Sequence, residues 1–136
     1  MSRKQIKLVD LPKILDPRGN LSFFENNNQI PFEIKRTYWI YDVPGGELRG
    51  SHAFKESNEF IVALSGSFDV VLNDGKKEVT YNLNRSYFGL FVPNMIWRRL
   101  ENFSTNSLAL VVSSAKYDES DYIRNFDEYK IMKNEN

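Results

Sequence analysis

The stretch that decides the fold runs from Gly46 to Gly66 and has the sequence G-E-L-R-G-S-H-A-F-K-E-S-N-E-F-I-V-A-L-S-G. Its apolar run, residues 60–64, is too short for a typical helix and ends in turn residues, so it predicts a buried strand. The only histidine of the chain, His52, lies in the polar segment before this run, and Glu59 opens the run. We therefore expect this strand, and a loop that leads into it, to carry the chemistry.

Length and composition exclude several classes of protein. The 136 residues suit one domain, residues 1–136, with a single hydrophobic core. Lys+Arg and Asp+Glu both number 18, so the zero net charge gives no reason to expect binding to nucleic acid or to a membrane surface. The absence of cysteine excludes disulfides, thiolate zinc sites and cysteine nucleophiles. Without an apolar leader or membrane span, the sequence predicts a soluble, cytoplasmic protein.

Short alternating or apolar runs, separated by turn residues, recur along the whole chain. This spacing predicts an all-β sandwich or barrel of nine or ten strands. A short helix is expected over residues 118–126, followed by a tail from Lys130 to Asn136. The expected strands cover residues 6–14, 21–25, 32–43, 60–64, 67–73, 77–83, 87–92, 95–103 and 108–113.

The opening stretch resembles the first motif of the cupin family, which are double-sheet jelly rolls. Gly46, His52, Glu59 and Gly66 fall on the motif, but Phe54 stands where the second histidine belongs. A second, degenerate cupin motif runs from Pro93 to Asn102 and has Arg98 in place of its histidine. The resemblance implies a cupin-type jelly roll with a short C-terminal helix or tail.

These substitutions argue against a metal cofactor. A cupin metal site needs three histidines and a carboxylate, or a close variant, whereas this chain keeps only His52 and Glu59. One imidazole and one carboxylate make a poor site for a transition metal, and Arg98 would place a permanent cation beside it. We expect no metal and no other cofactor.

A closer resemblance, to the sugar 3,4-ketoisomerases, covers almost the whole chain. The motifs are D-x-R-G-x-L at residues 16–21, I-P-F-x-I-K-R at 30–36, R-G-x-H-A at 49–53 and Y-D-E-S-D-Y-I-R at 117–124. The resemblance implies a metal-independent homodimer that acts on dTDP-4-keto-6-deoxyglucose and feeds the synthesis of dideoxyaminosugars for cell-surface glycans. Family members usually carry a histidine where this chain has Phe54.

The implied reaction moves a carbonyl from C4 to C3 of the sugar through an enediol or enediolate. It needs a base that titrates near neutrality and donors that stabilise the oxyanion. His52, as the only imidazole, is the expected base, and Glu59 is expected to orient its other nitrogen. The resemblance suggests Tyr38 as proton donor, although a core tyrosine with a bonded hydroxyl is an equal alternative.

The resemblance also implies a diphosphate, which arginine suits because of its fork of donors. The candidates lie in or beside the matched motifs: Arg18, Arg36, Arg49, Lys55 and Arg98. Arg98 should point into the barrel, where it needs an anionic partner such as Glu59. For stacking on thymine the candidates are Trp39, Tyr41, Phe88 and Trp97, and exposed strand edges near the N-terminus favour a homodimer.

Three other functions remain open on the sequence alone. Because Phe54 cannot transfer a proton, the chain could be a weakened cupin that only binds nucleotide sugars. It could also be another nucleotide-sugar epimerase on the same scaffold, although the His–Asp pair of the rhamnose 3,5-epimerases is not evident. The missing ligands argue against a metal-dependent dioxygenase.

Overall fold

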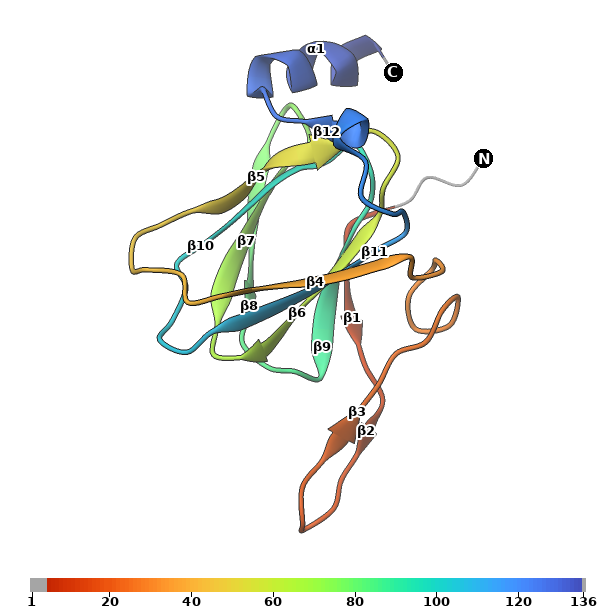
Figure 1. Ribbon diagram of the computed structural model, residues 1–136, viewed down its shortest axis with the longest axis vertical. Coiled ribbons are helices and arrows are strands. Elements are labelled where there is room, and N and C mark those ends of the chain that lie inside the picture. The colour runs from red at the N-terminus through yellow and green to blue at the C-terminus, as the bar shows by residue number, and fades with distance from the viewer. Residues whose placement is uncertain (1–4, 136) are drawn as a thin grey trace.

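The computed structural model describes residues 5–135, which form twelve strands, one 3₁₀ turn and one α-helix (Figure 1). The strands are β1 (Lys7–Asp10), β2 (Lys13–Ile14), β3 (Leu21–Ser22), β4 (Arg36–Tyr41), β5 (Arg49–Phe54), β6 (Glu59–Ser65), β7 (Phe68–Asn73), β8 (Glu78–Leu83), β9 (Phe88–Val92), β10 (Trp97–Glu101), β11 (Leu108–Ser113) and β12 (Tyr122–Ile123). The 3₁₀ turn η1 covers Glu119–Asp121 and the helix α1 covers Phe126–Glu135.

Two five-stranded antiparallel sheets make up the body of the molecule. Their strand orders are β1-β9-β6-β11-β4 and β12-β5-β10-β7-β8. Side chains from both sheets meet in one apolar cluster, which includes Ile61, Phe68, Leu90, Leu100 and Val111. Two antiparallel sheets that enclose one core form a cupin-type jelly roll, as the sequence predicts.

Strand β6 is buried on both faces, which explains its continuous apolar sequence. Ile61 and Ala63 point into the core between the sheets. Phe60 and Val62 point to the opposite face, where the segment that contains Ile30 and Phe32 covers them. The prediction of a buried strand at this position is confirmed.

The segment before β6 is a strand rather than the loop expected from the sequence. Residues Arg49–Phe54 form β5, which pairs with β10 on one side and with β12 on the other. Glycine at position 50 and several polar residues hid this strand, because they weaken the alternating pattern from which strands are recognised. His52 therefore lies on the regular framework of the barrel.

The C-terminal region also differs from the prediction. The expected helix at 118–126 is replaced by η1 and β12, because the Asp121 carboxylate accepts hydrogen bonds from the backbone N–H groups of Glu56 and Ser57. The expected tail is helix α1 instead, apart from residue 136, which lies outside the described residues. The side chain of Asn125 caps this helix by accepting from the N–H of Glu128, and Tyr129 is fully buried against the barrel.

Strands β2 and β3 form a separate hairpin that extends away from the two sheets (Figure 1). It exposes Ile14, Leu15 and Leu21. An isolated two-stranded hairpin with exposed apolar side chains is marginally stable by itself. In the described part of the chain, no helix is long and apolar enough to cross a membrane.

Candidate active site

A cavity of about 420 Å³ opens between β4, β5 and β10 and the segment that follows β11. Its lining includes four arginines and five titratable or aromatic side chains. They are Arg36, Arg49, Arg98, Arg124, Tyr38, Trp39, His52, Tyr117 and Tyr122. Strands hold most of these residues, so the geometry of the cavity is set by the rigid part of the fold.

Tyr38, Glu59 and Arg98 form one hydrogen-bonded group at the base of this cavity. Arg98 donates from Nε and Nη2 to Oε1 of Glu59, at 3.0 and 2.8 Å, and Nη2 also donates to the Tyr38 hydroxyl at 2.8 Å. The Tyr38 hydroxyl donates in turn to Oε2 of Glu59. Arg98 and Glu59 are each only 1% exposed, so the expected anionic partner of the buried arginine is present.

The charges of this group are mutually dependent. Burial alone would lower the pKa of Arg98, but the neighbouring Glu59 carboxylate, with Tyr38, outweighs burial and raises it. Burial raises the pKa of the Tyr38 phenol, and Glu59 raises it further against the opposing charge of Arg98. Tyr38 is therefore a neutral phenol whose hydrogen is held by Glu59.

Gly50 makes room for the Arg98 guanidinium. Its backbone has a φ of +69°, a conformation that glycine adopts without strain, and its carbonyl accepts from Nη1 of Arg98 at 3.0 Å. A Cβ at this position would lie 2.1 Å from the same Nη1. The glycine of the R-G-x-H-A motif is thus required by the arginine on the neighbouring strand.

His52 is buried beside this group, and the rings of Phe54 and Tyr122 contact it edge-on. The ring centroids lie 4.8 and 4.9 Å from that of His52. Burial, followed by the charges of Arg98, Arg124 and Arg36, lowers the pKa of His52 from 6.5 to about 2. The imidazole is therefore neutral, and its buried Nε2 has no hydrogen-bond partner within residues 5–135.

Glu59 does not orient His52, contrary to the expectation from the sequence. Both carboxylate oxygens of Glu59 are engaged by Arg98 and Tyr38. The physical reason is that a buried guanidinium competes more strongly for a carboxylate than a neutral imidazole does. Ring packing, rather than a carboxylate, positions His52.

Two arginines of the cavity have no carboxylate partner among the described residues, Arg36 and Arg49. The Arg36 guanidinium lies over the rings of Tyr38 and Tyr117, at 5.3 and 5.6 Å, and its buried Nε has no hydrogen-bond partner in the described chain. Arg124, by contrast, is paired with Glu119. A cavity with uncompensated guanidinium groups suits an anion.

The structure brings some of the predicted binding residues together and leaves others apart. Arg36, Arg49 and Arg98 reach the cavity, whereas Arg18 lies on the β2–β3 hairpin with its side chain 90% exposed and paired with Asp16. Lys55 lines a separate surface hollow next to this cavity. Within one chain, neither Arg18 nor Lys55 contributes to the site.

Of the aromatic residues considered for stacking, only Trp39 lines the cavity. Trp97 is buried among Phe126 and Tyr129 under helix α1, with ring centroids 5.2 and 5.7 Å away. Phe88 packs against the core between the sheets. These two residues have structural roles.

The residues at the site do not fit a metal ion. Among residues 5–135 no three His, Cys, Asp or Glu side chains are close enough to share one. His52 and Glu59 occupy the two cupin ligand positions that still carry a potential metal ligand. They cannot bind a metal together, because Glu59 is already hydrogen-bonded to Arg98. The donor set that remains is a single imidazole among guanidinium groups, which repels a cation.

Comparison with known proteins identifies the family. A family model described as "FdtA: WxcM-like, C-terminal" matches residues 4–134, and a TDP-4-oxo-6-deoxy-alpha-D-glucose-3,4-oxoisomerase from Aneurinibacillus thermoaerophilus is 41% identical over 91% of this chain and 89% of its own length. The chain belongs to the sugar 3,4-ketoisomerase family. A 3,4-ketoisomerase from Helicobacter canadensis has 41% identity and a TM-score of 0.93, with 97% of this chain and 99% of that one covered.

A further ketoisomerase structure, QdtA from Thermoanaerobacterium thermosaccharolyticum, is 33% identical with a TM-score of 0.93, over 96% of this chain and 94% of that one. That structure is a histidine-to-asparagine mutant in complex with TDP-4-keto-6-deoxyglucose.

In this sugar 3,4-ketoisomerase, three residues that line the cavity were not singled out from the sequence: Tyr117, Tyr122 and Arg124. They lie in the Y-D-E-S-D-Y-I-R motif, which was quoted only as part of the family resemblance. In the structure, Tyr122 pairs with Phe54 and so brings this segment against β5. Because no local pattern predicts a two-residue strand, the motif was the signal in the sequence that pointed to this segment.

Proposed function

We propose that this protein isomerises dTDP-4-keto-6-deoxy-D-glucose to a dTDP-3-keto-6-deoxyhexose through an enediolate, in the cytoplasm and without a metal. The observation that carries the proposal is the cavity itself. A neutral imidazole, His52, lies beside a buried hydrogen-bond donor group and two guanidinium groups that lack carboxylate partners. The TDP-sugar bound to the related QdtA mutant supports the choice of substrate.

In this proposal His52 removes the proton from C3, and the electrons of the C–H bond form the C3–C4 double bond of the enediolate. Negative charge develops on the C4 oxygen, where Arg98 and Tyr38 are the nearest donors at the base of the cavity. The imidazolium then protonates C4, while the hydroxyl proton of O3 passes to O4. Tyr38 is suited to carry this second proton because its hydroxyl already joins a donor and an acceptor.

The diphosphate has a second effect in addition to binding. Burial, followed by the charges of Arg98, Arg124 and Arg36, holds the pKa of His52 far below its ordinary value. A diphosphate placed against Arg36 and Arg49 would offset the charge of Arg36 and so raise the pKa of His52. The substrate would thus make His52 a stronger base.

The first experiment is incubation of chelator-treated protein with dTDP-4-keto-6-deoxyglucose in deuterated buffer, followed by proton NMR. We expect a 3-keto product, with the rate unchanged by the chelator. Tyr38→Phe should slow turnover by about 10²–10⁴-fold while dTDP still binds, which is the range for loss of a general acid or base. Binding of dTDP without formation of a 3-keto product would refute the isomerase and leave a nucleotide-sugar binding module.

The other functions considered are not favoured. A binding module has no use for a neutral imidazole whose Nε2 is buried without a partner. A rhamnose-type epimerase would pair its histidine with a carboxylate, whereas the carboxylate beside this histidine belongs to Arg98. The likeness to ketoisomerases extends over nearly the whole chain.

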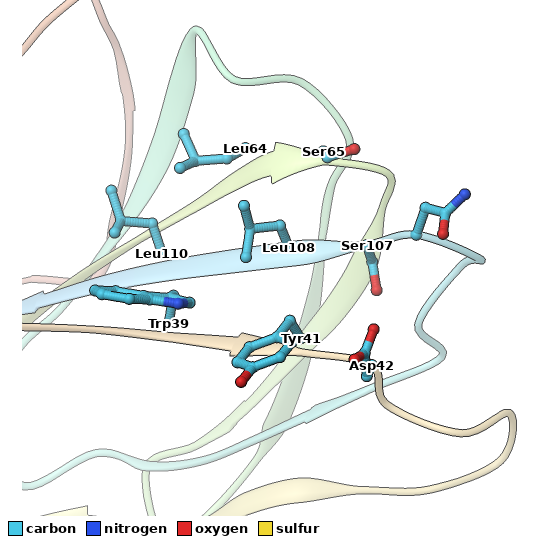
Figure 2. A pocket seen from close by; sticks show the side chains of 9 residues that line it. Trp39, Tyr41, Asp42, Leu64, Ser65, Ser107, Leu108 and Leu110 are labelled. Atoms are coloured by element: carbon cyan, nitrogen blue, oxygen red, sulfur yellow. The ribbon is translucent and has the colours of Figure 1, made fainter.

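We further propose that the chain forms a homodimer through the outer face of the first sheet. Figure 2 shows Trp39 and Tyr41 on β4 beside Leu108 and Leu110 on β11, with Leu64 on the next strand. Trp39 and Tyr41 are 58% and 62% exposed in the single chain. An apolar patch of this kind marks an interface, and Trp39 also lines the active-site cavity, so a partner there would lie beside the substrate.

Sedimentation velocity tests the dimer. Tyr41→Glu places a charge on the proposed interface and should give a monomer, whereas Ile131→Glu, at a similarly exposed position (60%) on α1, should leave the dimer intact. A monomeric wild-type protein, or a dimer that persists in Tyr41→Glu, would refute this interface.

A further inference from the structure

Phe54 is a buried apolar ring that belongs to none of the three apolar clusters of the described chain. It is only 4% exposed, yet its neighbours are polar or charged. Its ring contacts those of His52 and Tyr122, with centroids 4.8 and 4.6 Å away. The guanidinium carbons of Arg98 and Arg36 lie 5.9 and 6.0 Å from its centroid. Core packing does not explain a phenyl ring in these surroundings.

The position of Phe54 in the strand explains what it touches. Residues 52 and 54 lie on the same face of β5, because side chains alternate along a strand. Tyr122 is the direct cross-strand partner of Phe54 in β12. Phe54 and Tyr122 therefore close on the imidazole from its own strand and from the neighbouring one.

His52 is only 7% exposed. No described residue forms a hydrogen bond with its buried Nε2. The charged and titratable groups of the cavity around it come from five elements. They are Arg36 and Tyr38 of β4, Arg49 of β5, Glu59 of β6, which is bound to Arg98, Arg98 of β10, and Tyr117, Tyr122 and Arg124 of the C-terminal segment. Since no carboxylate holds the imidazole, its orientation depends on ring packing.

We propose that Phe54 is a positioning residue, which holds the His52 imidazole in one orientation and keeps water from it, so that the hydrogen taken from C3 of the substrate is returned to C4 by the same imidazole. The proposal rests on the isomerase function proposed above. The C3–H bond breaks and its proton passes to His52, the C3–C4 double bond forms, and the imidazolium then gives that proton to C4. The O3 proton moves to O4, so no oxidant or co-reactant is needed.

A phenyl ring suits this task better than a second histidine would. A second imidazole at position 54 would bring another proton that exchanges with solvent next to the first. Phe54 can neither donate nor accept a proton, so it does not compete for the proton held by His52. Its replacement should change the fate of that proton more than it changes substrate binding.

The first test needs no substrate. Because His52 is the only histidine, protein labelled with ¹⁵N-histidine gives the signals of one side chain. The wild type should show one neutral tautomer down to about pH 5, since burial dominates the low pKa. Phe54→Ala admits water and should raise the pKa of His52 by at least about one unit, whereas Phe54→Leu should stay near the wild type.

The second test follows the hydrogen itself. Substrate deuterated at C3 is converted in ordinary water, and the share of deuterium at C4 of the product is measured at early times. The wild type and Phe54→Leu should retain a measurable share of deuterium at C4. Phe54→Ala should retain less than half of the wild-type share, while its KM changes less than twofold. Phe91→Leu is the matched control, because Phe91 is also 4% exposed but packs in the cluster that holds Ile30 and Phe32.

Each result decides between defined alternatives. The proposal is overturned if Phe54→Ala leaves both the histidine titration and the retained deuterium unchanged, if the wild type retains no deuterium, or if Phe91→Leu has the same effects. If Phe54→Ala does not fold, Phe54→Leu and Phe54→His supply the same test. Phe54→Leu should keep the wild-type histidine titration and the wild-type share of retained deuterium, whereas Phe54→His should lose the retained deuterium. A protein without isomerase activity would refute the proposed function, while the histidine titration would still report on Phe54.

Discussion

Replacing Glu59 by leucine removes the carboxylate that neutralises a fully buried guanidinium. Arg98 is 1% exposed and gives two of its hydrogen bonds to Glu59, at 3.0 and 2.8 Å. Breaking a buried ion pair by removing one partner typically costs about 3–5 kcal/mol, because the remaining charge is left uncompensated. For a chain of this size, at about 4 °C per kcal/mol, the melting temperature should fall by about 12–20 °C.

The double variant Glu59→Leu/Arg98→Met separates this cost from a general loss of packing. Replacement of a buried pair by apolar side chains of similar volume is often neutral or stabilising, so the double variant should be more stable than either single variant. Urea unfolding followed by circular dichroism, at one fixed protein concentration, gives the free energies of unfolding for the cycle. The control is Glu119→Gln, which breaks the exposed pair with Arg124 and should change stability by less than about 1 kcal/mol.

The reasoning would be refuted by additive losses. If the double variant lost the sum of the two single losses, Glu59 and Arg98 would stabilise the fold independently rather than as a pair. A loss below about 1 kcal/mol for each single variant would show that water reaches this group.

Three further predictions follow from the same site. Gly50→Ala should abolish most activity and lower stability, because its Cβ would lie 2.1 Å from Nη1 of Arg98 at a φ of +69°; turnover and thermal unfolding measure this. The pKa of His52 is about 2 in the folded chain and ordinarily 6.5, so between these two values only the unfolded chain binds this proton. Stability therefore decreases as the pH is lowered below 6.5. Wild type should therefore lose about 2 kcal/mol more than His52→Asn between pH 7 and 5 in urea unfolding, and equal losses would contradict the buried, neutral imidazole. Addition of dTDP should raise the pKa of His52 measured by ¹⁵N NMR, and Arg36→Gln should reduce that rise. A pKa that does not change when dTDP binds would argue against compensation of the arginine charge by the diphosphate.

The sequence predicted the framework better than it predicted the edges. Strand β6 could be recognised because burial on both faces leaves an uninterrupted apolar run, Phe60 to Leu64. Strand β11 matched its expected bounds, Leu108–Ser113. Strand β5 could not be recognised, since Gly50 and His52 are there for Arg98 and for the cavity rather than for sheet propensity.

For the site, His52 was indicated as the only imidazole of the chain, and Arg98 was indicated by the cupin resemblance, which implies that its side chain points into the barrel. Whether Glu59 would pair with His52 or with Arg98 depended on how the two sheets face each other, because Glu59 belongs to the first sheet and the other two residues to the second; no local pattern contains this information. A short C-terminal helix was expected but was placed too early, at residues 118–126, because helix α1 buries essentially one side chain, Tyr129, and so has little apolar periodicity.

The segment after β11 has a consequence for the order of events during synthesis. Tyr117, Tyr122 and Arg124 line the cavity, but they follow the last strand of the first sheet in the chain. A nascent chain can therefore complete the first sheet before the residues of this wall have left the ribosome. The short β12 and the hydrogen bonds of Asp121 hold that wall against β5 and the turn that follows it. The first sheet can therefore form without the wall, whereas the complete cavity cannot.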